Sequence, residues 1–374
     1  MKRMKIVIAA AGTGGHINPG IAIANILKEK QPESEVIFIG TKTGIETDLV
    51  PRAGYKLQTI EAHGFNGKLN FDNVKKIIKT FLAIKDAKKI LKSFEPDIVI
   101  GTGGYICVPV LIAAHKLKIP TAIHESNAYP GSSVRLLSKK VDAILVGFEN
   151  ARGRLPKARK VVVTGTPTKV KDVALSDDEK NRVMEEFGLT NEKPIILVTG
   201  GSQGAKKINE AVLDIIERKL NKDYQIIFAV GSKQYGIIKE DLREKDVNIE
   251  KIDFVKIVPY IYNMEEVMKV VDLIICRSGA MTVKEISIVG VPAIFIPLAS
   301  VVSNRQEDNA RVLEKMGSAK VILNNELDYK ILSETINELL QDRDRLRQMG
   351  EKAKIIGIKN TDERIYDEIV KLVL

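Results

Sequence analysis

The sequence predicts an α/β fold with two doubly wound parallel sheets, and three observations lead to this prediction. Apolar runs of strand length alternate with helical stretches, a pattern typical of parallel sheets covered by helices on both faces. The alternation stops near Gly165, and a second series begins near Ile195. Each series opens with a glycine-rich turn between its first strand and the next helix, at 12–16 and at 200–204. We therefore expect two Rossmann-like domains that face each other across a cleft.

The strands are expected where apolar residues cluster in short runs. In the first series these runs are 5–10, 36–39, 56–60, 97–101, 121–124, 143–146 and 160–163. In the second series they are 195–199, 225–230, 249–254, 272–276, 293–296 and 320–323. Pro167 and a polar stretch at 176–179, which is typical of a helix cap, separate the two series.

Only helical segments follow the second series, at 329–340, 344–356 and 361–373. Gly357 lies between the last two of these segments and separates them. The chain is therefore expected to cross back there and to pack its final helix on the first domain. The expected domains are therefore 1–165, 166–356 and a C-terminal helix at 357–374.

Composition limits the possible functions. The chain has 374 residues, of which 44% are hydrophobic, enough for two cores. Its formal charge of +10 calls for an acidic partner, which could be nucleic acid, an anionic membrane or a phosphorylated substrate. Cys107 and Cys276 lie far apart in apolar contexts, which favours a reducing compartment and no structural zinc. The basic N-terminus leads into a strand, and no run is long enough to span a bilayer, so we expect no export.

The first glycine loop departs from two common nucleotide-binding motifs. A dinucleotide fingerprint would need glycine where Ile17 stands, and Thr41 occupies the place of the ribose-binding acid. A P-loop would need lysine and a hydroxyl residue where Ile21 and Ala22 stand. A single such cluster could serve only a tight turn. Two clusters at equivalent places in two domains instead favour two anion-binding loops.

Two further motifs follow strands of the second series. Residues 276–285, CRSGAMTVKE, indicate a strand-to-helix anion site with Glu285 about one turn inside the helix. Residues 304–310, NRQEDNA, open another helix with amide and acid side chains that suit sugar hydroxyls. Helix capping is the alternative role for both sets of polar residues.

Six motifs together resemble the nucleotide-sugar glycosyltransferases of the GT-B fold. They are GTGGHINPG (12–20), GTGGY (101–105), HESNAYPG (124–131), GGSQGA (200–205), CRSGAMTVKE (276–285) and NRQEDNA (304–310). The resemblance covers essentially the whole chain. Within that family it is especially close to bacterial enzymes of peptidoglycan synthesis. It implies inverting transfer of N-acetylglucosamine from UDP-N-acetylglucosamine to the 4-hydroxyl of an N-acetylmuramyl-pentapeptide linked to undecaprenyl diphosphate.

The resemblance also implies which residues hold the donor. The acceptor belongs to domain 1–165, and the UDP-sugar belongs mainly to 166–356. The implied phosphate ligands are Ser202, Ala280, Met281 and Thr282, with Ile261 at uracil through its backbone, Glu285 at the ribose and Gln306 at the sugar hydroxyls. From the first domain the implied contacts are Thr13, Gly14, Gly15 and Asn127, and Lys169 of the second domain is a further implied nucleotide contact. At Thr166 and Lys169 the family often has asparagine and arginine, and a lysine lacks the planar fork of arginine.

The chemistry requires a stabilised diphosphate and a deprotonated acceptor hydroxyl. The only Asp-x-Asp spelling, Asp342–Asp344, falls in a polar turn between late helices. We therefore predict metal-independent catalysis without a cofactor, in which helix N-termini and loop amides meet the developing charge. His16, at the mouth of the first glycine loop, is the first candidate for the general base, because imidazole titrates near neutral pH. Glu125 is the second candidate, and His124 is expected to orient the loop.

A basic amphipathic helix is expected at 71–91. Its apolar face comprises Phe71, Val74, Ile77, Ile78, Phe81, Leu82, Ala87 and Leu91, and its basic residues are Lys75, Lys76, Lys79, Lys85, Lys88, Lys89 and Lys92. Together with Lys139 and Lys140, it predicts docking on an anionic membrane at about 1 kcal/mol per lysine near the surface. An ordinary core-packed helix with a solvated lysine face is the alternative. With the resemblance, docking implies a peripheral location on the cytoplasmic face of the bacterial cell membrane.

Three other functions are alternatives to glycosyl transfer in peptidoglycan synthesis. Nucleic-acid binding has little support, because aromatic residues are scarce and no helix-turn-helix, RNA-recognition or zinc pattern occurs. A glycosyltransferase acting on diacylglycerol would share the fold. A sugar-nucleotide epimerase of the same architecture would be expected to carry carboxylates deep in the cleft, where this chain has Gly14, Gly15, His16 and Asn127.

Overall fold

The computed structural model divides the chain into two compact units. Unit 1 comprises Met1–Lys169 and Ile358–Leu374, and unit 2 comprises Val170–Gly357. The structure describes residues 3–62, 71–201, 203–245, 252, 254–298, 304–358 and 360–374, and the side chains of 71–81 are outside this description. Each unit is described by itself.

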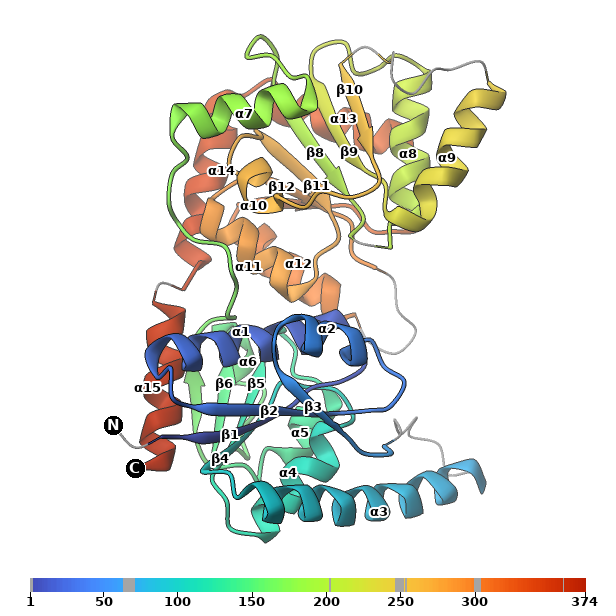
Figure 1. Cartoon of the computed structure of the whole chain (residues 1–374). Coiled ribbons are helices and arrows are strands. Elements are labelled where there is room, and N and C mark those ends of the chain that lie inside the picture. Colours follow the sequence, from blue (N-terminus) through green and yellow to red (C-terminus); the bar gives the residue numbers. More distant parts are fainter. Residues whose placement is uncertain are drawn as a thin grey trace. The chain divides into compact units, whose positions relative to one another are not determined.

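Unit 1 contains a seven-stranded parallel sheet in the order β3-β2-β1-β4-β5-β6-β7 (Figure 1). The strands are β1 Lys5–Ala9, β2 Glu35–Gly40, β3 Lys56–Thr59, β4 Ile98–Gly101, β5 Thr121–Glu125, β6 Ala143–Val146 and β7 Val161–Val163. Each end of these strands lies within one residue of the predicted run. The predicted parallel sheet is therefore confirmed for this unit.

Helices cover both faces of this sheet. Successive side chains of a strand point to opposite faces, and apolar side chains on both faces need cover. They are α1 Gly14–Lys30, α2 Glu46–Arg52, α3 Phe71–Phe94, α4 Cys107–Lys116, α5 Ser132–Leu137, α6 Glu149–Arg152 and α15 Thr361–Val373. Ile6 and Ile8 of β1 lie in one core cluster with residues of α1, α2 and α15. Val7 and Ala9 lie in the other with residues of α3, α4, α5 and α6. One strand thus anchors two separate hydrophobic layers.

Unit 2 contains a six-stranded parallel sheet in the order β10-β9-β8-β11-β12-β13. The strands are β8 Ile195–Thr199, β9 Gln225–Ala229, β10 Val255–Val258, β11 Leu273–Cys276, β12 Ala293–Phe295 and β13 Ala319–Val321. The helices are α7 Asp177–Phe187, α8 Lys206–Glu217, α9 Ser232–Glu244, α10 Met264–Met268, α11 Ala280–Val289, α12 Arg305–Lys315, α13 Tyr329–Leu340 and α14 Arg343–Ile356. Residues of α8, α9, α13 and α14 share one core with this sheet.

One predicted strand was misplaced. The run 249–254 was expected to pair, but the strand is β10, and Phe254 lies before it with φ of 61° and an exposed side chain. Residues 246–251 and 253 lie outside the described part of the chain. Val255, Ile257 and Val258 continue the apolar pattern directly after the expected run. A positive φ at a non-glycine residue breaks the extended backbone at Phe254, and the strand begins at the next residue.

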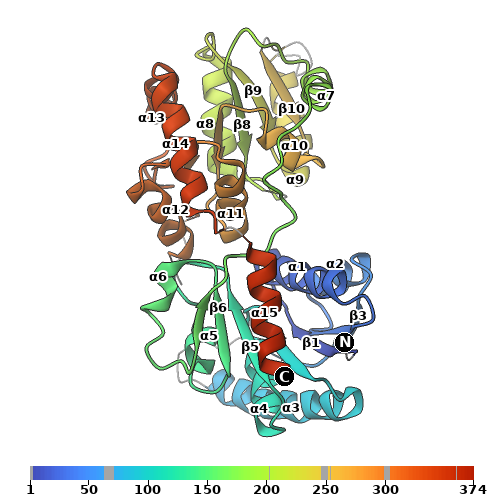
Figure 2. The same cartoon turned by 90° about the vertical axis from the view of Figure 1, so that its left-hand side faces the viewer.

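Helix ends largely follow their sequence signals. Ser176 and Glu179 form a capping box at the start of α7, as the polar stretch there predicted. The chain leaves α14 at Gly357, and α15 runs beside α1 with Ile365 and Ile369 in the core of unit 1 (Figure 2). The final helix therefore packs on the first sheet.

The strand orders locate the ligand-binding edge of each sheet. In open parallel sheets, ligands bind beyond the carboxyl ends of the strands, where the strand order reverses. This point lies between β1 and β4 in unit 1 and between β8 and β11 in unit 2. The four loops that follow these strands carry four of the six motifs, which start at 12, 101, 200 and 276.

Candidate active site

The loop after β1 leads directly into α1. Gly12 has φ of +97°, a conformation that favours glycine, and Thr13 is the N-cap residue of the helix. Gly14 and Gly15 form the first turn, whose N–H groups have no acceptor within the helix. The N–H groups of His16 and Ile17 donate to the carbonyl of Thr13 at 3.0 and 3.1 Å. Thr13 and Gly15 are exposed, so this turn can receive an anion.

The loop after β4 packs directly against His16. A Cβ atom at Gly103 would lie 2.7 Å from Cδ2 of His16, and one at Gly104 would lie 3.2 Å from Nδ1. Both glycines have positive φ. The hydroxyl of Thr102 donates to the carbonyl oxygen of His16 at 2.7 Å. The motifs at 12–20 and 101–105, which are about 90 residues apart in the sequence, thus form one site around a half-buried imidazole.

The imidazole of His16 also has a polar neighbour on its own loop. Its Nδ1 lies 3.3 Å from Oγ1 of Thr13. Held by this contact and by the glycines of the β4 loop, the ring has a defined orientation at the carboxyl edge of unit 1. The ring is thus fixed at the edge where ligands bind in open parallel sheets.

Glu125 ends β5 at the same edge and is almost fully buried. Its Oε1 accepts hydrogen bonds from the backbone N–H and the side-chain amide of Asn127 at 2.9 and 2.8 Å. Its Oε2 accepts the N–H of Gly131 at 2.6 Å. The carboxylate therefore shapes the loop that carries Asn127, and removing a substrate proton would compete with three hydrogen bonds.

His124 lies one residue before and is fully buried. Its Nε2 lies 3.0 Å from the carbonyl oxygen of Gly165, and its Nδ1 lies 3.3 Å from Oγ of Ser126. The carbonyl can only accept, so Nε2 carries the proton. Burial lowers the pKa of His124 to about 4, so the ring is neutral at physiological pH. The geometry is that of a residue that orients the loop, as predicted.

The two cysteines are packing residues. Cys107 lies under the β4 loop and donates to the carbonyl of Gly103 at 2.9 Å, and burial raises its pKa to about 12. Burial raises the pKa of Cys276 further, and both thiols are free. Thiols in this state are poor nucleophiles.

In unit 2, the loop after β11 leads into α11. Gly279 is the N-cap residue, and Ala280, Met281 and Thr282 form the first helical turn, whose N–H groups point beyond the helix. Glu285 is half-buried on the next turn. A helix N-terminus with these small residues suits a phosphate.

Hydrogen bonds join this turn to α12. The hydroxyl of Ser278 donates to the carbonyl of Gln306 at 2.7 Å, and the side-chain amide of Asn309 donates to the carbonyl of Ser278 at 3.2 Å. The side-chain oxygen of Gln306 accepts the N–H of Leu298 at 2.9 Å. Gln306 is therefore positioned beside the start of α11, with its amide nitrogen available to donate to a ligand.

Arg277 is a residue that the sequence analysis did not select. Its guanidinium donates to the carbonyl of Ile296 at 2.9 Å and to Oδ1 of Asn324 at 2.8 Å. These contacts tie together the loops that follow β11, β12 and β13. Burial lowers the pKa of Arg277, although the group stays charged. Its place in the motif at 276–285, directly after β11, was the signal in the sequence.

The glycine loop after β8 serves partly for packing. A Cβ atom at Gly200 would lie 2.3 Å from the backbone nitrogen of Ala205, and one at Gly204 would lie 2.2 Å from the carbonyl oxygen of Val230. Gly201, with φ of +82°, faces open space. Two of its glycines thus allow close backbone approach, and the third lies where a ligand could approach. Ser202 lies outside the described residues.

The remaining predicted residues are single positions. Ile261 follows β10 at the carboxyl edge and is buried as a whole residue. Lys169 is exposed at the end of the first segment of unit 1. Asp342 caps α14 by accepting the N–H of Arg345 at 2.9 Å, so the Asp-x-Asp spelling is a helix start. Among the described residues, no group of three or more His, Cys, Asp or Glu side chains could hold a metal ion.

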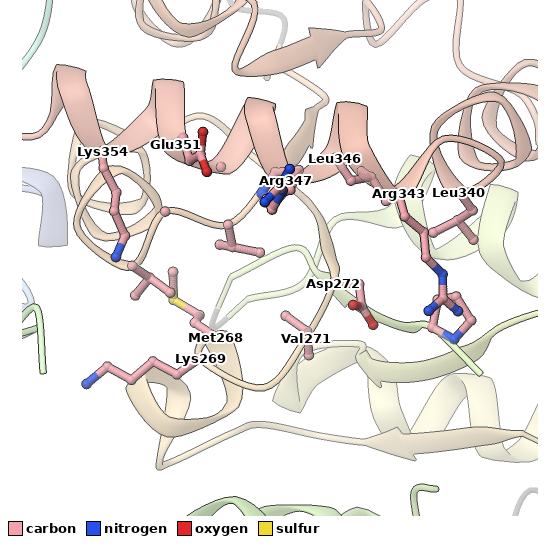
Figure 3. Close-up of a pocket in the computed structure, with 16 residues that line it drawn as sticks. Met268, Lys269, Val271, Asp272, Leu340, Arg343, Leu346, Arg347, Glu351 and Lys354 are labelled. Atoms are coloured by element: carbon pink, nitrogen blue, oxygen red, sulfur yellow. The ribbon is translucent and has the colours of Figure 1, made fainter. Parts of the chain in front are cut away.

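Two cavities lie at the opposite edge of the sheets. One, of about 440 Å³, is lined by Pro194, Asp272 and Pro292, which precede β8, β11 and β12, and by residues of α14 (Figure 3). Two cations of its lining pair with acids, Arg347 with Asp344 and Lys354 with Asp172. The second, of about 500 Å³, is lined by residues that precede β5 and β6 in unit 1. Neither cavity contains a predicted site residue.

Anion-binding turns at the carboxyl edges of two doubly wound sheets define a class of enzyme that acts on nucleotide-linked substrates. The chain belongs to glycosyltransferase family 28. Residues 6–146 match the glycosyltransferase family 28 N-terminal domain, and residues 195–366 match its C-terminal domain. The protein is therefore a glycosyltransferase, as predicted from its motifs.

Relatives cover the full length of the chain. A protein of Acetivibrio thermocellus is 43% identical over 98% of this chain and 98% of its own. Its name is UDP-N-acetylglucosamine--N-acetylmuramyl-(pentapeptide) pyrophosphoryl-undecaprenol N-acetylglucosamine transferase. The crystal structure of Acinetobacter baumannii MurG is 28% identical, with a TM-score of 0.79 over 98% of this chain and 99% of that one. The UDP-GlcNAc 2-epimerase of Neisseria meningitidis, at 16% identity and a TM-score of 0.66 over 98% of this chain and 100% of that one, shares the fold.

Proposed function

We propose that this protein transfers N-acetylglucosamine from UDP-N-acetylglucosamine to a muramyl-pentapeptide linked to undecaprenyl diphosphate. The observation that carries this proposal is the imidazole of His16, held between two glycine loops at the carboxyl edge of unit 1. The name of the Acetivibrio relative supplies the substrates. Transfer to the 4-hydroxyl of the muramyl sugar with inversion is part of the proposal.

The donor binds mainly to unit 2. The first-turn amides of α11, at Ala280, Met281 and Thr282, receive the diphosphate, and the helix dipole favours the negative charge that develops as UDP leaves. Glu285 takes the ribose, Gln306 donates its amide to a sugar hydroxyl, and the backbone of Ile261 contacts uracil. Thr13, Gly14, Gly15, Asn127 and Lys169 complete the contacts, with Ser202 from the β8 loop.

His16 is the general base that receives the acceptor proton. The acceptor oxygen forms a bond with the anomeric carbon, the bond from that carbon to the diphosphate oxygen breaks, and the hydroxyl proton moves to the imidazole. Glu125 is less suited to this role, because its two oxygens already accept three hydrogen bonds from residues of its own loop. It positions Asn127 instead.

Radiolabel transfer tests the proposed function. We expect label from UDP-N-acetylglucosamine to appear in a short-chain lipid-linked muramyl-pentapeptide, with UDP-glucose as a poor donor, and to persist in the presence of EDTA. A protein that labels diacylglycerol instead, or that only interconverts the sugar of the donor, would contradict the proposal. A strict requirement for magnesium would contradict the metal-independent mechanism.

The acceptor carries a lipid, so we propose that unit 1 docks peripherally on an anionic membrane at its cytoplasmic face. In the described part of α3, Ile84, Ala87 and Leu91 are buried, which is the core-packed arrangement. Leu82 is exposed, and so are Lys85, Lys89 and Lys92. Lys139 and Lys140 after α5 are also exposed. Among the described residues, no helix has both the length and the apolar character to cross a bilayer.

Charge reversal tests membrane docking. Replacing Lys85, Lys89 and Lys92 with glutamate should weaken binding to phosphatidylglycerol vesicles by about 100-fold, because each lysine near the surface contributes about 1 kcal/mol. The matched control reverses three exposed lysines of unit 2, Lys222, Lys233 and Lys239, with the same change in net charge. Equal co-sedimentation of the two triple variants would contradict docking through α3. The same reversal at Lys75, Lys76 and Lys79 extends the test to the first half of the helix.

A further inference from the structure

A buried carboxylate lies beside the first glycine loop. Glu46 is the first residue of α2, and its side chain is 0% exposed. Its Oε1 accepts the backbone N–H and the hydroxyl of Thr41, which follows β2, at 2.9 and 2.6 Å. Its Oε2 accepts the N–H of Gly12 at 3.2 Å. One carboxylate therefore joins the end of β2 to the first glycine of the loop after β1.

The surroundings leave room for this carboxylate only because two neighbours are glycines. A Cβ atom at Gly44 would lie 2.1 Å from Oε2 of Glu46, and one at Gly40 would lie 2.8 Å from its Cγ. Burial opposes ionisation of Glu46, but the hydrogen bonds from Thr41 and Gly12 outweigh it and lower the pKa of the carboxyl. Glu46 is thus ionised, and hydrogen bonds to a charged acceptor are stronger than neutral ones.

The hydrogen bond from Gly12 restricts an otherwise flexible turn. Gly12 has a positive φ, and glycine has more conformational freedom than other residues. The far side of the same loop is held by the hydroxyl of Thr102, which donates to the carbonyl of His16 at 2.7 Å. Residues 12–16 are therefore held from both neighbouring strands, β2 and β4. The N–H of Gly12 donates to Glu46, so the anion-binding amides of this loop begin after Gly12.

We propose that Glu46 is a positioning residue for glycosyl transfer. It holds the N–H of Gly12, fixes the start of the loop that carries Thr13 and His16, and so sets the geometry of proton transfer. This role rests on the proposed function of His16 as the base. A shift of about 1 Å in a reacting group can cost about 100-fold in rate, so loss of this anchor should lower turnover.

A pair of variants separates positioning from stability. In Glu46→Gln, the amide can keep both contacts with Thr41 through Oε1, but its NH2 group then faces the N–H of Gly12 and two donors oppose each other. Thr41→Val removes a different hydrogen bond of the same carboxylate and leaves Gly12 held. We expect Glu46→Gln to lower kcat at least about tenfold with the Kd for UDP unchanged, and Thr41→Val to stay within about twofold of the parent.

Hydrogen exchange supplies a readout that does not depend on activity. Amides of residues 12–16 should exchange faster in Glu46→Gln than in Thr41→Val, at equal protein stability in urea. If the parent protein transfers no N-acetylglucosamine, the proposed function fails. The exchange rates still test whether Glu46 holds the N–H of Gly12. Equal exchange and equal turnover per folded molecule in the two variants would overturn the role of Glu46.

Gly44→Ala provides a second route if Glu46→Gln does not fold. Its methyl group would lie 2.1 Å from Oε2 and 2.4 Å from Oε1 of Glu46, so it would push the whole carboxylate away from Gly12 and Thr41 while its charge remains. We expect the same loss of turnover and the same faster exchange at 12–16. A Gly44→Ala protein that matches the parent in both measurements would also overturn the proposal.

Discussion

Replacing His16 with alanine should lower turnover by about 10²- to 10⁴-fold, the range that a general base contributes. The loss should fall on kcat, because UDP is proposed to bind mainly through the first turn of α11 in unit 2. The contact between Thr102 and the backbone carbonyl of His16 survives the substitution, so the loop should keep its fold. Steady-state kinetics with the lipid-linked acceptor and calorimetry with UDP measure the two quantities separately.

Two further variants control this prediction. His16→Gln keeps a polar side chain of similar size but cannot accept a proton near neutral pH, so its turnover should be as low as that of His16→Ala. Thr13→Val removes the hydroxyl that lies 3.3 Å from Nδ1 and leaves the imidazole, so the loss should be below about tenfold. A fall of less than about tenfold in His16→Ala, with UDP binding intact, would exclude general-base catalysis at this residue. Glu125 would then become the base to test.

The parts of the site that local sequence determines, namely its strands and turns, could be predicted from the sequence. The apolar runs gave the strands, and the glycine motifs gave the turns that follow β1, β4 and β8. The contact of Gly103 and Gly104 with His16 could not be predicted from the residues alone, since it depends on β1 and β4 being neighbours in the sheet. The spatial order of parallel strands is a long-range property that local pattern does not encode.

Glu46, which is fully buried, and Arg277, which is half-buried, show the same limit. Glu46 and Arg277 each contact backbone groups of loops that follow different strands. Glu46 lies outside the six motifs, and Arg277 lies in the motif at 276–285 but is not among the ligands that the motif predicted. Charged residues are almost never fully buried unless they are paired, so a sequence pattern places them on the surface by default. Only the tertiary structure shows which loops they join. Glu125 was selected as a possible base for its place after a strand, and its three hydrogen bonds could not be anticipated from that place.

Acidification should destabilise unit 1 through His124. Its pKa is lowered to about 4 in the folded state by burial, against about 6.5 for an exposed histidine. Between these values the unfolded chain binds a proton that the folded protein does not, so the free energy of unfolding falls as the pH falls. The slope is about 1.4 kcal/mol per pH unit, which gives about 2 kcal/mol between pH 6.5 and 5. Urea unfolding followed by circular dichroism measures the change, and hydrogen exchange in β5 and β6 assigns it to unit 1.

Carboxyl groups also titrate in acid, so the effect of the His124 imidazole must be measured as a difference between two proteins. The side chain in His124→Gln can keep a hydrogen bond to the carbonyl of Gly165 and does not titrate in this range. Between pH 6.5 and 5, the free energy of unfolding of this variant should therefore fall by about 2 kcal/mol less than that of the parent. His115→Gln, at a half-buried site at the end of α4, is the matched control. Parallel pH profiles for His124→Gln and the parent would mean that the buried imidazole is protonated in the folded state. That protonation would require both ring nitrogens to donate, with Oγ of Ser126 accepting the hydrogen bond from Nδ1.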